Sequence, residues 1–261
     1  MRIRSMGSIL ALVSALSFAS VLLAQSAKQS GAAKAQTATP NLSGVWNLRS
    51  SPSTRYLGYA FMAEEPPMTP WAVERFKTAK PSFGPHGVEN SNDPVNPTTV
   101  NAVGCFPPGV PRIYLHPFPM EILQVPGRVI MLFEFNHFIR QIYTDGRQHS
   151  TDLGPTWMGD SIGTWQGDTL VVDTIGLNDK TWIDRIGHPH SEALHVVEHI
   201  RRVNNNTLQD DLTFEDPKAY TKPWGGQLVF QLRPDWNITE LVCEDNVNFD
   251  EFLKNEAKPS K

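Results

Sequence analysis

From Arg112 onward the chain is built from short runs of β-branched and aromatic residues separated by turn signals. Such runs form strands, and turns such as Asp145-Gly146 and Gln166-Gly167-Asp168 join neighbouring strands. The expected strands are 112–116, 120–124, 128–135, 138–144, 161–165, 169–174, 193–203, 207–214, 227–233 and 238–242. Roughly ten strands with mostly short connections predict an all-β fold, an antiparallel meander closed into a barrel or folded as a sandwich.

The N-terminus has the pattern of a secretory signal. Two arginines precede an uncharged, mostly apolar stretch, and small residues follow near Ser26. We expect residues 1–26 to be a signal peptide, 27–40 a flexible leader and 41–255 a single β-barrel-like domain. An uncleaved membrane anchor is the alternative. The mature protein is predicted to be periplasmic or secreted, with no membrane partner after cleavage.

The chain has two cysteines, Cys105 and Cys243. In an oxidising compartment an even pair usually forms a disulfide, although two free thiols are the alternative. A bond between them would tie an early loop to the end of the fold.

The region before the strands is rich in proline. Thr69-Pro70 has the pattern of an N-cap followed by proline at the first helical position, which predicts a short helix to about Ala79. Residues 81–111 are expected to form a long, irregular loop. The net charge of −4, with lysine and arginine scattered along the chain, argues against a nucleic-acid partner.

The phrase Gly44-Val45-Trp46 stands in the first expected strand. A Gly-x-Trp at this place resembles the start of the lipocalins and related calycin barrels, in which the tryptophan plugs one end. The chain departs from that family by its proline-rich insertion and by more strands than the usual eight or so. The phrases at 144–147 and 159–168 resemble those of an uncharacterised group of exported bacterial proteins, which offers no activity to transfer.

Two familiar catalytic motifs occur in unsuitable contexts. His195–His199 is an H-x-x-E-H sequence, which binds zinc when both histidines share one helix face. On a strand those histidines would stand about 13 Å apart, too far for one zinc ion. Gly159–Gly163, centred on Ser161, matches a nucleophile elbow, which needs a strand turning into a helix. Because both segments are expected to be β, neither motif supports a peptidase or serine hydrolase.

Side chains of the expected strand 193–203 point alternately to its two faces. We expect the face with more aliphatic side chains to point into the fold. That face carries Leu194, Val196, Glu198, Ile200 and Arg202. Ionised groups on an inner face are either paired for structure or used for chemistry. Glu134 and Asp173 follow apolar runs in a similar way, and Arg140 is the expected partner of Glu134.

The loop His188-Pro189-His190 follows Asp184 and supplies further candidates for proton transfer. A surface loop of polar turn formers is the alternative, and metal binding by His188 and His190 also stays open. Nearby aromatic residues are candidates to line a ligand pocket, and packing in the barrel core or at its end is the alternative for each. They are Trp165, Trp182, Tyr220 and Trp224.

These features predict an exported enzyme that binds a small, partly apolar organic molecule in a barrel cavity. Its acid–base chemistry would be of lyase, isomerase or hydrolase type, without metal or cofactor. The candidate catalytic residues are Glu198, His190, Asp173, Asp184, Arg202, Arg140 and Glu134. The alternatives are a lipocalin-like periplasmic carrier without turnover and an envelope protein that docks a partner through residues 81–111.

Overall fold

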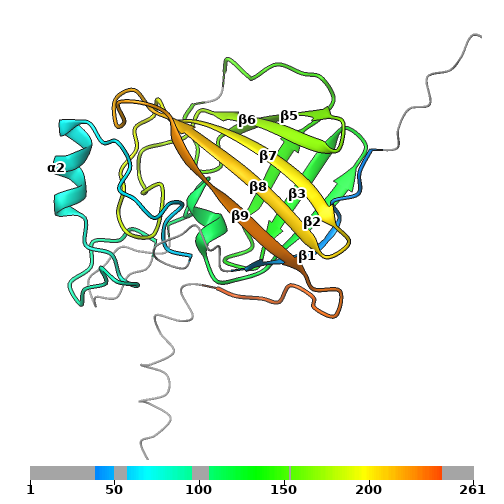
Figure 1. Cartoon of the computed structure of the whole chain (residues 1–261), viewed down its shortest axis with the longest axis horizontal. Coiled ribbons are helices and arrows are strands. Elements are labelled where there is room, and N and C mark those ends of the chain that lie inside the picture. Colours follow the sequence, from blue (N-terminus) through cyan, green and yellow to red (C-terminus); the bar gives the residue numbers. More distant parts are fainter. Residues whose placement is uncertain (1–38, 50–57, 96–105, 153, 243–261) are drawn as a thin grey trace, which may run out of the picture. The chain divides into compact units, whose positions relative to one another are not determined.

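The computed structural model describes residues 39–49, 58–95, 106–152 and 154–242. Nine strands form a closed barrel in which strands adjacent in sequence are adjacent in space, and β1 pairs with β9 (Figure 1). The strands are β1 (Gly44–Arg49), β2 (Met120–Val125), β3 (Arg128–Phe133), β4 (Ile139–Tyr143), β5 (Asp160–Gln166), β6 (Thr169–Ile175), β7 (His195–Asn204), β8 (Thr207–Glu215) and β9 (Trp224–Leu232). The predicted all-β barrel is confirmed.

The strand pairing departs from a pure meander at one point. β4 and β5 run parallel, with Ile142 opposite Ser161, whereas every other neighbouring pair is antiparallel. A parallel pair requires a connection that returns along the barrel, and the described residues 144–152 and 154–159 belong to this connection. Tight turns join other strands, as at Gly167, whose φ of 65° suits glycine.

The barrel interior follows the predicted alternation. Along β7 the residues Val196, Glu198 and Ile200 are buried, and along β8 alternate residues from Leu208 to Phe214 are buried. The expected inner face of 193–203 is therefore confirmed. Trp46 of β1 is fully buried, and its Nε1 donates to the Leu42 carbonyl at 2.9 Å.

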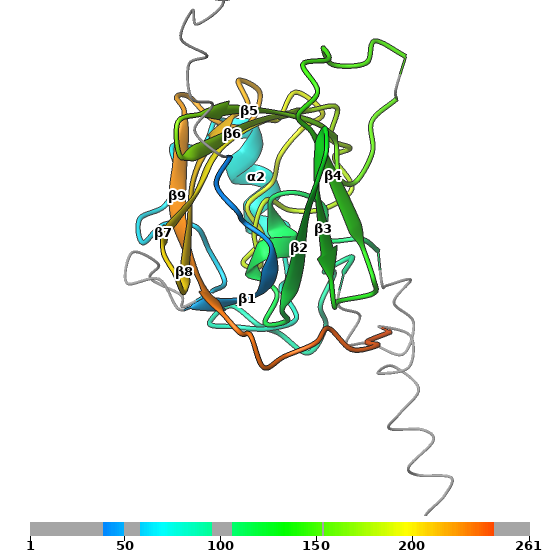
Figure 2. The same cartoon turned by 90° about the vertical axis from the view of Figure 1, so that its right-hand side faces the viewer.

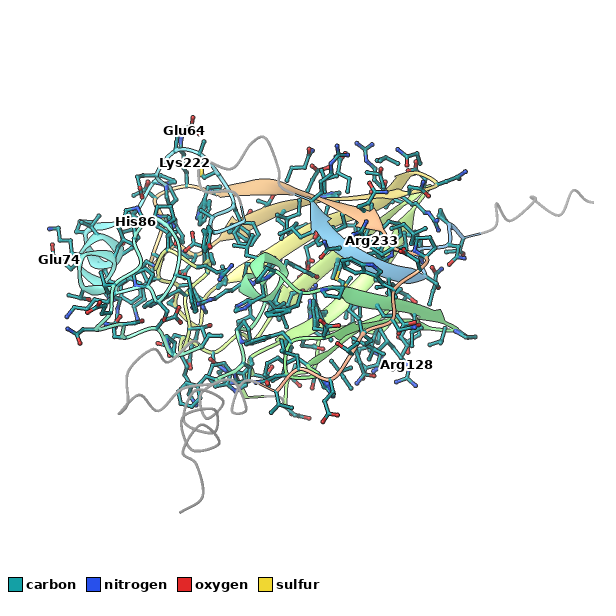
Figure 3. All side chains as sticks on the ribbon, turned by 90° about the horizontal axis from the view of Figure 1, so that it is seen from below. Glu64, Glu74, His86, Arg128, Lys222 and Arg233 are labelled. Atoms are coloured by element: carbon teal, nitrogen blue, oxygen red, sulfur yellow. The ribbon has the colours of Figure 1, made fainter. Side chains whose placement is uncertain are left out.

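One α-helix, α2 (Pro70–Thr78), occupies the predicted position. The Thr69 hydroxyl accepts the Ala72 N–H, and Pro70 stands in the first turn, where its missing N–H costs no hydrogen bond. α2 lies beyond one end of the barrel (Figures 1 and 2). Its outer face is polar, and Figure 3 shows Glu74 on the side away from the strands.

Two expected strands are not present. Residues Arg112–Leu115 form a 3₁₀ helix, η1, because Pro111 and Pro117 flank the run and cannot donate in a sheet. Residues 238–242 make only an isolated bridge between Leu241 and Phe135. Both neighbours of β9 are already in place, and a closed barrel has no edge for another strand.

Some expectations concern segments outside the described residues. These are the signal peptide, the leader up to residue 38, and the disulfide between Cys105 and Cys243. Across the described ranges, no helix is long and apolar enough to cross a membrane.

Candidate functional site

Five consecutive strands each place one polar side chain inside the barrel, and all five side chains are nearly inaccessible to solvent. They are Arg140 of β4, Ser161 of β5, Thr174 of β6, Glu198 of β7 and Asp210 of β8. Residue alternation brings them together, because each stands at an inward position of its strand. We call these five residues the interior cluster.

Arg140 is the centre of the interior cluster. Its Nη1 and Nη2 donate to the two carboxylate oxygens of Glu198 at 2.8 and 2.5 Å. Nη2 also donates to Thr174 Oγ1 at 2.8 Å and to Ser161 Oγ at 3.1 Å. Tyr114 of η1 adds its hydroxyl, which donates to Glu198 Oε1 at 2.9 Å and contacts Arg140. Both oxygens of Glu198 therefore have protein donors.

Asp210 is the second carboxylic acid of the interior cluster. Burial, and next the negative charge of Glu198, raise the pKa of Asp210 well above its usual range. Arg140 and Glu198 form the ion pair of the interior cluster. Burial, the largest single effect, lowers the pKa of Arg140, but Glu198, Tyr114 and Asp210 together outweigh it and raise the pKa.

Arg202 shares the inner face with Glu198 but makes no ion pair with it. Its guanidinium lies near the strand end, where it donates to the carbonyls of Asn205 and Asn41 and stacks over Trp46. Residues four apart on a strand are separated by about 13 Å, so Arg202 is too far from Glu198 to pair with it. Glu198 pairs instead with Arg140 of β4.

The expected pairing of Glu134 with Arg140 is wrong. Glu134 lies beyond the end of β3, and its Oε2 accepts from the backbone and hydroxyl of Thr239 at 2.8 and 3.1 Å. Arg140 instead points into the barrel. The turn between them contains Asn136 and His137 with φ of 51° and 53°, a left-handed conformation that sequence patterns did not indicate.

Asp173 lies on the outside of the barrel, since its neighbour Thr174 occupies the inward position. One of its oxygens contacts His149 Nε2 at 3.1 Å and His195 Nε2 at 3.0 Å, and its side chain is 45% exposed. Asp173 thus belongs to an outer surface group and is separated from Glu198 by the sheet.

Asp184 and His188 form a second buried acid–base pair, in the long loop between β6 and β7. Asp184 Oδ2 contacts His188 Nδ1 at 2.5 Å, and its Oδ1 accepts the backbone N–H groups of residues 186–188. Glu65 contacts the other ring nitrogen at 2.9 Å, and Phe76 of α2 stacks on the ring. Burial lowers the pKa of His188, but Asp184 and Glu65 outweigh it and raise it to about 9. This histidine is a cationic link between the loop and the segment that contains α2.

His190 has the opposite character. It is 4% exposed, and burial lowers its pKa below the usual value, so the imidazole is neutral at pH 7. Its Nδ1 lies 3.2 Å from the Ser191 carbonyl, and the tautomer with a proton on Nδ1 makes this hydrogen bond. Nε2 then carries a lone pair, and within the part of the chain described here no residue hydrogen-bonds to it.

His190 lines a pocket of about 300 Å³. The pocket is built from α2 and from loops, with no strand residue in its wall. Its other polar and aromatic lining residues include Arg75, Asn92, Asp179, Lys180 and Trp182. The pocket therefore lies outside the barrel interior, beside the helix at its end.

Only Trp182 of the four expected aromatic residues lines this pocket. Tyr220 acts indirectly, because its hydroxyl donates to the carbonyl of Pro189 at 2.7 Å and so fixes the residue before His190. Trp224 packs against Tyr220 and His188, and Trp165 packs against the core.

The structure brings in pocket residues that the sequence did not single out, among them Arg75, Asn92 and Lys180. Lys180 had a local signal, because it stands two residues before Trp182 in a polar turn. Arg75 and Asn92 had none, since only the placement of α2 and of the loop 91–95 carries them to His190.

The described residues contain no group of three or more His, Cys, Asp or Glu side chains that could hold a metal ion. The ring nitrogens of His188 are both occupied by carboxylates. The fold and the sites define a closed nine-stranded barrel with a neutral histidine in a pocket at its end. No family model, curated protein or solved structure matches the chain.

Proposed function

We propose that the protein is an exported enzyme that binds a small, partly apolar organic molecule beside His190 and moves a proton of that molecule. The observation that carries the proposal is the state of His190: a buried, neutral imidazole whose Nδ1 is held by Ser191 and whose Nε2 is left for a ligand. Such a group is suited to act as a general base near pH 7. The reaction would be of lyase, isomerase or hydrolase type.

The composition of the pocket wall supports a mixed ligand. Trp182 and Pro94 offer flat apolar surface, whereas Lys180 and Arg75 offer positive charge. A cation near the base can stabilise negative charge that develops when a proton is removed. A volume of about 300 Å³ accommodates a small molecule of metabolite size.

The proton transfer would take place in the pocket at the end of the barrel. The interior position is less suitable, because Glu198 is already saturated by Arg140 and Tyr114. Removing a proton from a substrate needs a base with an available lone pair, and His190 has one.

The test is turnover by the purified mature protein. A panel of activated esters and small hydroxy and keto acids is followed by NMR, and at least one compound should be consumed at neutral pH. His190→Gln should slow that reaction about 10²- to 10⁴-fold, which is the usual contribution of a general base. His199→Gln is the matched control, because His199 is exposed on the outer face of β7.

Two results would contradict the proposal. One is an unchanged rate in His190→Gln. The other is saturable binding of panel compounds without any turnover, which would favour the alternative of a carrier protein.

A further inference from the structure

Two buried arginines, Arg112 and Arg185, lie near the carboxylate of Asp93. Arg112 is fully buried, and its Nη2 donates to both oxygens of Asp93 at 2.9 and 2.6 Å. Arg185 is 9% exposed, donates to the Leu115 carbonyl at 3.2 Å and lies over the ring of Tyr59 at 4.5 Å. Arg185 has no carboxylate of its own among the described residues, so the group carries one positive charge in excess.

Three buried nitrogen atoms of this group have no hydrogen-bond partner within the described residues, and that of His116 donates only in the tautomer with its proton on Nε2. Nε and Nη1 of Arg112 and Nε2 of His116 are buried and hydrogen-bond to no atom in the described ranges. A guanidinium has five N–H donors, and the contact with Asp93 uses only Nη2. Buried polar groups are rarely left unsatisfied, and a bound ion or water is a common reason when they are.

The electrostatics of the group agree with this geometry. Burial, together with Arg112, lowers the pKa of Arg185 to about 10, so Arg185 stays charged at neutral pH. Burial first, and then Arg112 and Arg185, lower the pKa of His116 well below its usual value. The three side chains therefore share one electropositive environment, which an anion would relieve.

The electropositive group adjoins the pocket beside His190. The guanidinium of Arg112 lies over the ring of Trp182 at 5.3 Å, and Trp182 also lines the pocket. Pro94, the residue after Asp93, lines the pocket as well. Arg112 and Arg185 do not line the pocket themselves, but a ligand in it would contact the Trp182 ring that the guanidinium of Arg112 covers.

We infer that Arg112, Arg185 and His116 bind the oxygen atoms of a carboxylate or phosphate group, and that the ligand is a small organic anion. Arginine suits this role, because its planar donors match the oxygens of both groups. The inference rests on the proposed function in one respect, namely that this anionic group is part of the same molecule from which His190 removes a proton.

Calorimetric titration of the full mature chain with benzoate and with inorganic phosphate, at constant ionic strength in chloride, tests the inference. At least one probe should bind saturably at millimolar or lower concentration. Binding by benzoate alone identifies a carboxylate site, and binding by phosphate alone identifies a phosphate site.

Variants locate the binding. Arg185→Met should weaken it at least tenfold. Arg112→Lys, which keeps the charge but removes most of the guanidinium donors, should also weaken it. Arg128→Met is the control, because Arg128 is exposed and lies away from α2 (Figure 3). The inference is overturned if neither probe binds saturably, or if Arg185→Met and Arg112→Lys both bind the probe as tightly as the wild type does.

His190→Gln separates the two proposals. Anion binding should survive in this variant while turnover is lost. Anion binding by the wild type without turnover of any panel compound would contradict the proposed function alone, whereas turnover without anion binding would contradict this inference alone.

Discussion

Arginine side chains are buried both in the barrel interior and at the barrel end, but their N–H donors find different numbers of hydrogen-bond acceptors in the two places. Inside the barrel, Arg140 donates to Glu198, Thr174 and Ser161. At the end, Arg112 leaves Nε and Nη1 without acceptors in the described part of the chain. A saturated ion pair holds strands together, whereas unsatisfied donors beside a pocket leave capacity for a ligand.

Breaking the interior pair should have the largest effect on stability. Glu198→Gln leaves the buried cation of Arg140 without its counter-charge, which costs about 3–5 kcal/mol in comparable buried pairs. The free energy of unfolding, measured by urea denaturation, should fall by that amount. Asp145→Asn breaks the exposed pair with Arg147 and should leave the midpoint unchanged. Equal effects of the two variants would contradict the distinction between saturated interior and exposed charges.

The cationic histidine at the barrel end should make stability depend on pH. The pKa of His188 rises from 6.5 to about 9 on folding, because Asp184 and Glu65 outweigh burial. Its contribution is fully present below pH 6.5 and is lost as pH rises through 9. A shift of this size corresponds to a loss on the order of 3 kcal/mol.

Urea midpoints at several pH values between 6 and 10 measure this loss. His188→Gln should flatten the dependence, whereas His137→Gln, a change in the exposed turn after β3, should leave it unchanged. A wild-type midpoint that is constant across this range would contradict a folded-state imidazolium.

The smallest of the three effects should come from the hydroxyl that η1 adds to the interior. Tyr114→Phe removes one donor from Glu198 but leaves the two bonds from Arg140, so a loss of about 1–2 kcal/mol is expected. Tyr143→Phe, on the half-buried end of β4, is the control. If Tyr114→Phe destabilised as much as Glu198→Gln, the tyrosine and not Arg140 would be the main partner of the carboxylate.

Features that depend on residues close together in the sequence were predicted correctly, whereas contacts between distant segments were not. Most strand positions, the inner face of β7 and the helix α2 follow from periodicity and from a local cap, so they were predictable. The partner of Arg140 was not, because it depends on strand register and on which positions face inward across four strands.

The amino-acid pattern was enough to predict an all-β fold, a barrel or a sandwich, with a short helix and with Glu198 on the inner face. Short-range alternation and turn chemistry are enough for that. The three-dimensional fold was needed to show that the sheet closes into a barrel, that Glu198 is paired with Arg140, that Asp173 faces outward and that His190 is neutral in a pocket beside α2. Burial, charge balance and the state of a histidine arise from segments far apart in the chain, and no local pattern encodes them.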